Sequence, residues 1–178
     1  MPWLGICFLL VGSIGGIFFV PMDYQQGESF KIIFVHVPCA WAAMGIYGLM
    51  VLGALLGLST KSLYWHLRVL AIAPIGLVFT ILSITSGAIW GSLMWGTYWV
   101  WDARLTSMLL LALLYLGFIS INKVIEKHKR LNSLLIVVLG GINLPIIKWS
   151  VEWWATLHQG ATFFRSNSIT LSMSWPMI

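Results

Sequence analysis

Five apolar stretches, each close to the length of a membrane-spanning helix, constrain this chain more than any other feature. A helix needs about 20 mainly apolar residues to cross a bilayer. Of the residues, 60% are hydrophobic and only 8% are charged, whereas soluble domains carry about 25% charged residues. The sequence therefore predicts an all-α integral membrane protein that forms a single domain over residues 1–178. The predicted spans are Trp3–Val20, Ile32–Leu58, Val69–Ile89, Leu105–Ile121 and Leu131–Ile147.

A sixth apolar segment begins at Ser168, but the sequence ends at Ile178, so this segment is too short to cross a bilayer. We therefore expect a bundle of about six transmembrane helices, the last one incomplete. Either the chain is truncated or its tail lies at the interface. No Lys or Arg precedes Lys31, unlike the basic start of a cleavable signal, so the first span is expected to be retained.

Basic residues in the connections predict the orientation of the spans. Lys61 and Arg68 lie between the second and third spans, and four more basic residues lie at 123–130, between the fourth and fifth. Lys and Arg concentrate on the cytoplasmic side, which places these connections and the N-terminus inside. The net charge of +5 is small and sits largely in loops, which argues against nucleic-acid binding. Three segments then face outside: Pro21–Lys31, Trp90–Arg104 and Lys148–Asn167.

Tryptophan is concentrated in two of these outer segments. Four of the eleven tryptophans fall within 90–101 and three more within 148–167. A belt of aromatic residues commonly anchors helix ends at both membrane faces, but the inner connections hold only Trp65. The pattern favours an aromatic platform for a large, flat ligand over a belt alone. The first group consists of Trp90, Trp95, Trp99 and Trp101.

Two of the four histidines lie on the same side as the tryptophans. His36 lies near the outer end of the second span and His158 in the last outer segment, whereas His66 and His128 lie at inner connections. Two neutral imidazoles can ligate a haem iron from opposite faces. We therefore expect His36 and His158 to be metal ligands of a non-covalently bound haem, since no CxxCH motif is present. Zinc is less favoured, because the outer side lacks a third histidine.

Asp102 and Arg104 close the tryptophan-rich loop. Arg104 either pairs with Asp102 at the membrane surface or binds a haem propionate, since a guanidinium suits carboxylates bidentately. Both interpretations stay open, and they are compatible. Trp95 and Trp99 are four residues apart and share one face if this loop is helical.

Three stretches resemble one family of haem-handling membrane proteins. The segment WGTYWVWDARLTS, residues 95–107, resembles the tryptophan-rich "WWD" signature. Its continuation after Asp102 is similar to the CcmC (haem exporter protein C) family of cytochrome c maturation. The related cytochrome c haem lyases usually continue with a proline and an acidic residue. KIIFVHVPCAWAAMGIY at 31–47 and SVEWWATLHQGAT at 150–162 resemble the family's two histidine segments.

The resemblance implies both a site and a role. It implies that His36 and His158 are the axial ligands of haem b. It implies presentation of haem on the extracytoplasmic side to the haem chaperone CcmE, together with CcmD and the ABC-type subunits CcmA and CcmB. The family has a complete sixth helix, whereas this sequence ends where that helix should begin. The WWD loop, about residues 90–104, is then expected to pack against haem through Trp95, Trp99, Trp101 and Asp102.

This reading makes the chain a haem carrier rather than a stand-alone enzyme. It places the chain in a bacterial inner membrane or, as the alternative, a mitochondrial inner membrane. Two other functions stay open at this point. A cytochrome b-like electron-transfer subunit also holds haem between histidines on membrane helices, but only His36 lies within a predicted span. A non-haem transporter or assembly subunit would use its tryptophans as lipid anchors.

Overall fold

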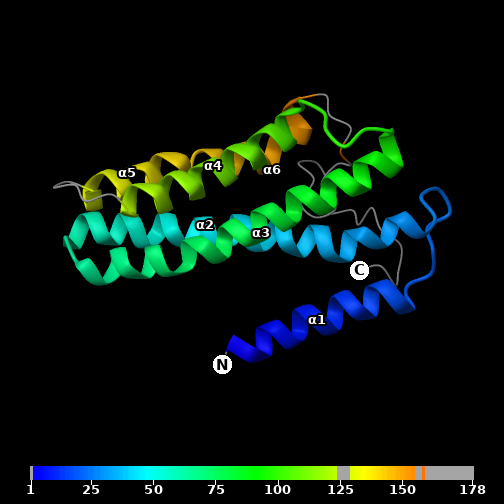
Figure 1. Cartoon of the computed structure of the whole chain (residues 1–178), viewed down its shortest axis with the longest axis horizontal. Helices are drawn as coiled ribbons and strands as arrows, with labels where there is room; N and C mark the ends of the chain where they lie inside the picture. Colours follow the sequence, from blue (N-terminus) through cyan, green and yellow to red (C-terminus); the bar gives the residue numbers. More distant parts are fainter. Residues whose placement is uncertain (1, 124–128, 155–157, 159–178) are drawn as a thin grey trace.

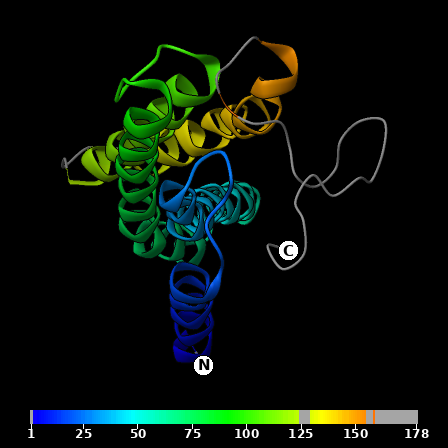
Figure 2. The same ribbon diagram turned by 90° about the vertical axis from the view of Figure 1, so that its right-hand side faces the viewer.

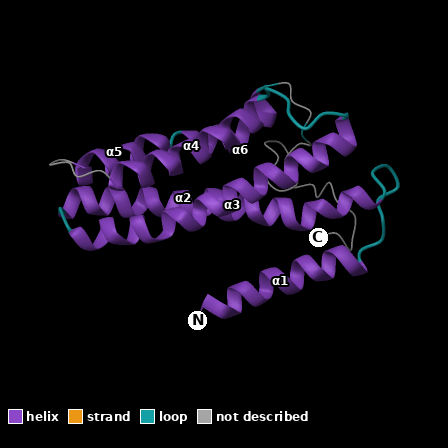
Figure 3. Cartoon of the chain, in the orientation of Figure 1, coloured by secondary structure: helices purple, strands orange, loops and turns teal. Residues whose placement is uncertain are grey.

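The computed structural model describes residues 2–123, 129–154 and 158 of the chain (Figure 1). Over these residues the chain is helical with short loops and has no strand (Figure 3). The predicted all-α membrane fold class is confirmed. The helices are α1 (Pro2–Phe19), the 3-10 helix η1 (Glu28–Ile32), α2 (Ile33–Thr60), α3 (Leu63–Trp95), α4 (Ala103–Lys123), α5 (Lys129–Gly140) and α6 (Asn143–Trp153).

Four segments of the described chain are long and apolar enough to cross a membrane. They correspond to the second, third, fourth and fifth predicted spans. The first predicted span is α1, in which Leu10–Phe19 forms a shorter apolar helix. The sixth predicted segment, from Ser168, lies outside the described residues. The four long segments are Glu28–Thr60, Leu63–Trp95, Ala103–Lys123 and Arg130–Trp153.

The fifth span consists of two helices, whereas the sequence predicts one continuous helix. The break is Gly141–Ile142, directly after Gly140 at the end of α5, and glycine is the poorest helix former after proline. The amide of Gly141 donates to the carbonyls of both Val137 and Val138, each at 3.1 Å. The backbone therefore stays hydrogen-bonded through the break, as a bilayer requires. Helix α6 then continues to Trp153, beyond the predicted end of this span.

Helix α2 is central to the bundle. It packs along α3 on one side and against α5 on another, while α4 packs on α3, α5 and α6. Figure 2 shows α1 on the far side of α2 from the group formed by α4, α5 and α6. On that side Ser13 Oγ donates to the carbonyl of Phe34 at 2.9 Å, and Gly16 lies directly against the Phe34 ring. Helix α1 is thereby attached at the start of α2.

Two tyrosines fill the centre of the bundle. Tyr47 on α2 and Tyr115 on α4 are fully buried, and their rings meet edge to face with centroids 5.1 Å apart. Tyr115 Oη donates to the carbonyl of Ala43 at 2.8 Å. A Cβ added to Gly76 would overlap the Tyr115 hydroxyl, and one added to Gly140 would overlap the Tyr47 hydroxyl. The helices approach this closely because each hydroxyl faces a residue without a side chain.

The segments predicted to share the outer side gather at one end of the bundle. The end of α1, the start of α2, the junction of α3 with α4 and the end of α6 all lie on the right in Figure 1. The turn between α2 and α3 and the start of α5 lie at the opposite end. The described parts of the three outer segments are therefore neighbours, and which end faces outside stays a prediction.

Candidate functional site

His36 lies in the first turn of α2, with its ring against α3. Its Nδ1 is 3.0 Å from the carbonyl oxygen of Ser83 and 3.2 Å from Ser86 Oγ. A carbonyl oxygen only accepts hydrogen bonds, so Nδ1 carries the proton and donates it. In a neutral imidazole the other nitrogen, Nε2, then holds the lone pair that a metal ion binds.

One face of α3 forms the cradle of His36. A Cβ added to Gly87 would lie 2.7 Å from His36 Cε1, so the imidazole occupies space that only a glycine leaves. Trp90, one turn further along, meets the His36 ring edge-on at 6.0 Å between centroids. Its Nε1 donates to Gln26 Oε1 at 3.2 Å, which orients the indole. Ser83, Gly87 and Trp90 share a face because they are spaced by four and three residues.

His158 follows α6 and contacts the tryptophan-rich loop. Its Nδ1 is 2.9 Å from Asp102 Oδ2, and its ring meets that of Trp95 edge-on at 5.2 Å. The other oxygen of the buried Asp102 accepts from the backbone N–H of Leu105 at 2.7 Å. The carboxylate is therefore held from both sides, as the N-terminal cap of α4 and as the partner of His158.

The charge state of His158 suits metal binding. Burial lowers the pKa of His158 below its usual value, and the nearby Arg104 guanidinium lowers it further. The hydrogen bond and the charge of Asp102 act in the opposite direction but do not cancel the effect of burial. The neutral imidazole, which is the form that binds metals, is thus favoured.

The tryptophan-rich loop is not helical over residues 96–102, between α3 and α4. Helix α3 ends at Trp95, and Gly96 follows with φ +72°, a left-handed conformation that glycine adopts readily. Trp95 and Trp99 therefore do not share a helix face, and the arrangement that depended on a helical loop is wrong. Trp95 contacts His158, whereas Trp99 packs on Trp101 with ring centroids 5.4 Å apart. Trp101 itself is 75% exposed.

Arg104 lies at the start of α4 and contacts α6. Its Nη2 reaches the carbonyl of Lys148 at 3.5 Å, the long limit for a hydrogen bond. Over the described residues, the side chain that pairs with the Asp102 carboxylate is His158, through the 2.9 Å hydrogen bond, rather than Arg104. Arg104 Nε and Trp99 Nε1 are buried donors that have no hydrogen-bond partner among the described residues. Such donors are rare in folded proteins, and a carboxylate is an acceptor that suits a guanidinium.

The structure brings the candidate ligands to the same end of the bundle. His36 lies at the start of α2, and His158 contacts Trp95 at the end of α3 and Asp102 just before α4. Within the described part of the chain, no group of three or more His, Cys, Asp or Glu side chains is arranged to hold a metal ion. The described residues therefore offer no zinc-type ligand set, and His36 and His158 stay the candidate ligands.

Sequence reasoning missed the residues on α3 that hold His36. Ser83, Ser86 and Gly87 were not singled out, and Trp90 was treated only as part of the tryptophan group. A signal was present, because Ser83, Ser86 and Gly87 form a small, polar strip inside an otherwise apolar span. Small and polar residues on membrane helices commonly mark contacts between helices.

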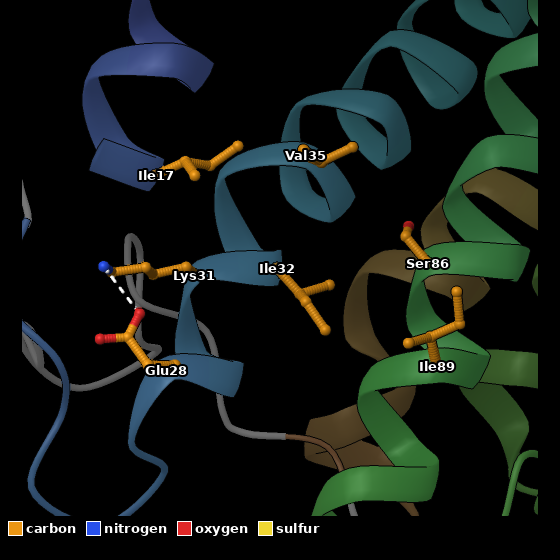
Figure 4. A pocket seen from close by; sticks show the side chains of 7 residues that line it. All are labelled: Ile17, Glu28, Lys31, Ile32, Val35, Ser86 and Ile89. Atoms are coloured by element: carbon orange, nitrogen blue, oxygen red, sulfur yellow. Dashed lines mark ion pairs between the residues drawn. The ribbon is translucent and has the colours of Figure 1, made fainter.

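An apolar pocket of about 320 Å³ lies beside the site, between α1, η1, α2 and α3 (Figure 4). Ser86, the hydrogen-bond partner of His36, forms part of its wall, and the ion pair between Lys31 and Glu28, at 2.8 Å, lies at its edge. Its remaining walls are aliphatic, so it is not the tryptophan-walled cleft that the sequence predicts. The pocket is lined by Ile17, Glu28, Lys31, Ile32, Val35, Ser86 and Ile89.

Comparison with known proteins gives a consistent result. The chain matches the family model described as CcmC, heme exporter protein C, over residues 1–178. Heme exporter protein C of Escherichia coli strain K12 is 47% identical over 99% of this chain and 74% of its own length. The protein of the same name from Haemophilus influenzae is 46% identical over 99% and 73%. A putative cytochrome c biosynthesis ccmC-like mitochondrial protein of Marchantia polymorpha is 42% identical over 98% and 76%.

Proposed function

Because this chain belongs to the CcmC family of heme exporter proteins, we propose that it binds haem b between His36 and His158 and presents it on the extracytoplasmic side. Its role is haem handling in cytochrome c biogenesis, within a membrane. In this proposal the chain is a carrier, and covalent attachment of haem belongs to its partners.

One observation carries the proposal: both histidines present the same tautomer. His36 gives its Nδ1 proton to the Ser83 carbonyl, and His158 has its Nδ1 against the Asp102 carboxylate. Histidines that bind metals almost always donate their second ring N–H to a carbonyl or a carboxylate, and this orients the ring. In both side chains, Nε2 is therefore the ring nitrogen whose lone pair would bind an iron atom.

The surroundings fit an anionic, largely apolar macrocycle. Trp90 lies against His36 and Trp95 against His158, so each candidate ligand has an indole beside it. A tryptophan buries 150–250 Å², and at ~25 cal/mol per Å² two such rings supply roughly 10 kcal/mol before ordering costs. The unpartnered donors of Arg104 and Trp99 suit the propionate groups. Haem supplies the iron centre and a reactive edge, while these residues bind, orient and shield it from water.

We propose the haem chaperone CcmE as the recipient, with CcmD, CcmA and CcmB as further subunits. A recipient needs an accessible edge of the site. Trp101, which is 75% exposed, is the most exposed large hydrophobic side chain of the tryptophan-rich loop. The bacterial relatives favour a bacterial inner membrane. A mitochondrial inner membrane is the alternative, given the similarity to a plant ccmC-like mitochondrial protein.

The test is the absorption spectrum of the protein purified in detergent and loaded with haem. The wild type is expected to give the low-spin spectrum of two axial histidines, and His36→Ala and His158→Ala are each expected to lose it. His66→Ala is the matched control, because His66 is a buried histidine near the opposite end of α3. Circular dichroism checks that each variant is folded. An unchanged low-spin spectrum in both site variants would rule the proposal out.

A further inference from the structure

The two candidate ligands differ in what accepts their Nδ1 proton. His36 has only neutral acceptors, namely the Ser83 carbonyl at 3.0 Å and the Ser86 hydroxyl at 3.2 Å. His158 has a carboxylate oxygen of Asp102 at 2.9 Å. A hydrogen bond to a charged acceptor is roughly twice as strong as one between neutral groups. A carboxylate partner also raises the basicity of a ligating imidazole.

Resting on the proposed two-histidine haem site, we propose that Asp102 is a positioning residue that makes His158 the stronger ligand, and that His36 is the ligand that yields when haem is handed on. Transfer requires that one iron–nitrogen bond break while the other still holds the cargo. The bond to the less basic imidazole breaks first, and this assigns the two histidines different roles.

The structure keeps the carboxylate in place for this role. Asp102 is only 8% exposed, and its Oδ1 accepts the Leu105 N–H at 2.7 Å while Oδ2 faces His158. The Ser86 hydroxyl donates its own proton to the Leu82 carbonyl at 2.7 Å, so it accepts from His36 with a neutral oxygen rather than a charged one.

The positions of the two histidines agree with this order of release. His36 lies within the membrane-spanning segment Glu28–Thr60. His158 lies five residues beyond Trp153, where the last described span ends. The Asp102 partner of His158 directly follows the exposed Trp101. When His36 lets go, the retained ligand is thus the one beside the exposed edge, where a recipient arrives.

The first experiment compares haem retention by the two single variants in the full-length protein after gel filtration. His36→Ala is expected to retain haem as a high-spin complex through His158. His158→Ala is expected to retain at least about tenfold less, because outer partners of ligands typically change metal affinity 10–100-fold. Equal loss, or greater loss from His36→Ala, overturns the inference while leaving the two-histidine site intact. An unchanged low-spin spectrum in both variants contradicts the proposed site itself.

The second experiment measures the midpoint potential of bound haem in Asp102→Asn. Asparagine caps helices as well as aspartate does and still accepts a hydrogen bond, so this change removes the charge and spares the fold. The carboxylate stabilises ferric iron, so its loss is expected to lower the ferric-over-ferrous preference about tenfold, an upward shift of about 59 mV for one electron.

Ser86→Ala is the matched control, because it removes a neutral acceptor from His36 and leaves the Ser83 carbonyl. Its midpoint potential is expected to stay close to that of the wild type. An unshifted potential in Asp102→Asn overturns the inference, and so does an equal shift in Ser86→Ala. Because the comparison of the two histidine variants does not involve Asp102, it decides the order of ligand strength independently.

Discussion

Substituting Gly87 by alanine is expected to displace His36 and leave the rest of the bundle intact. The new Cβ would lie 2.7 Å from His36 Cε1 and 3.2 Å from its Nδ1. Ordinary contact begins at 3.4 Å, so the ring has to retreat by about 0.7 Å. A retreat straight away from α3 would lengthen the 3.0 Å hydrogen bond to Ser83 to roughly 3.7 Å, which is no longer a hydrogen bond.

The size of the effect follows from these distances. Forcing extra methyl groups into a packed site typically costs about 1–3 kcal/mol, which corresponds to a roughly 5- to 150-fold loss of affinity. Alanine is a better helix former than glycine by about 1 kcal/mol, so α3 itself is not weakened. The loss is therefore expected in haem binding and in the low-spin spectrum, rather than in helix content.

The assay is a haem titration of Gly87→Ala beside Gly45→Ala, followed by absorbance. Gly45 lies on α2 like His36, and a Cβ added there would meet nothing within 4 Å. The Gly45→Ala protein is expected to bind like the wild type. If Gly87→Ala bound haem with wild-type affinity and an unchanged spectrum, His36 would not be a ligand held against α3, and the argument from the α3 cradle would fail.

Three further predictions concern the core and the surroundings of haem. Gly76→Ala drives a methyl group into the Tyr115 hydroxyl and is expected to lower thermal stability by about 1–3 kcal/mol, measured as the midpoint of thermal aggregation in detergent; an unchanged midpoint contradicts the packing described. Arg104→Gln is expected to weaken haem binding roughly 10- to 150-fold, because hydrogen bonds to a charged group contribute about 1.5–3 kcal/mol. Binding of haem dimethyl ester, whose propionates carry no charge, is expected to stay unchanged. Equal weakening of both ligands would refute the propionate role. Trp90→Phe removes the 3.2 Å hydrogen bond to Gln26 and is expected to change haem affinity only a few-fold in the same titration, whereas Trp90→Ala also removes the ring beside His36 and should cost more.

The helices could be predicted from the sequence because apolar length is a sufficient signal in a membrane. The first five predicted spans coincide with helices, the fifth of them with two. The side shared by His36 and the tryptophan-rich loop follows from alternating the direction of successive spans. The break in the fifth span was not predicted. A glycine pair in a membrane helix does not by itself indicate a break, and the contact of Gly140 with the Tyr47 hydroxyl is visible only in the folded structure. Glycines in membrane helices serve many contacts, and only packing shows which one.

The candidate site also has some features that the sequence predicts and others that it does not. The placement of its candidate residues at one end of the bundle could be inferred, because histidine and tryptophan are conspicuous in an apolar chain, whereas the side of the membrane stays a prediction. The hydrogen bonds could not be inferred, since Ser83 and Asp102 meet their histidines across 47 and 56 positions of sequence. The non-helical course of the loop depends on Gly96, whose left-handed conformation is set by how α3 ends.

The fit of Tyr115 against Gly76 and of Tyr47 against Gly140 fixes the axial register of the central helices. Sliding α3 by one helical turn, 5.4 Å, would place a side chain where the Tyr115 hydroxyl now fits. Helices α2, α3 and α4 are therefore expected to move as one body, with His36 and Asp102 at a constant separation.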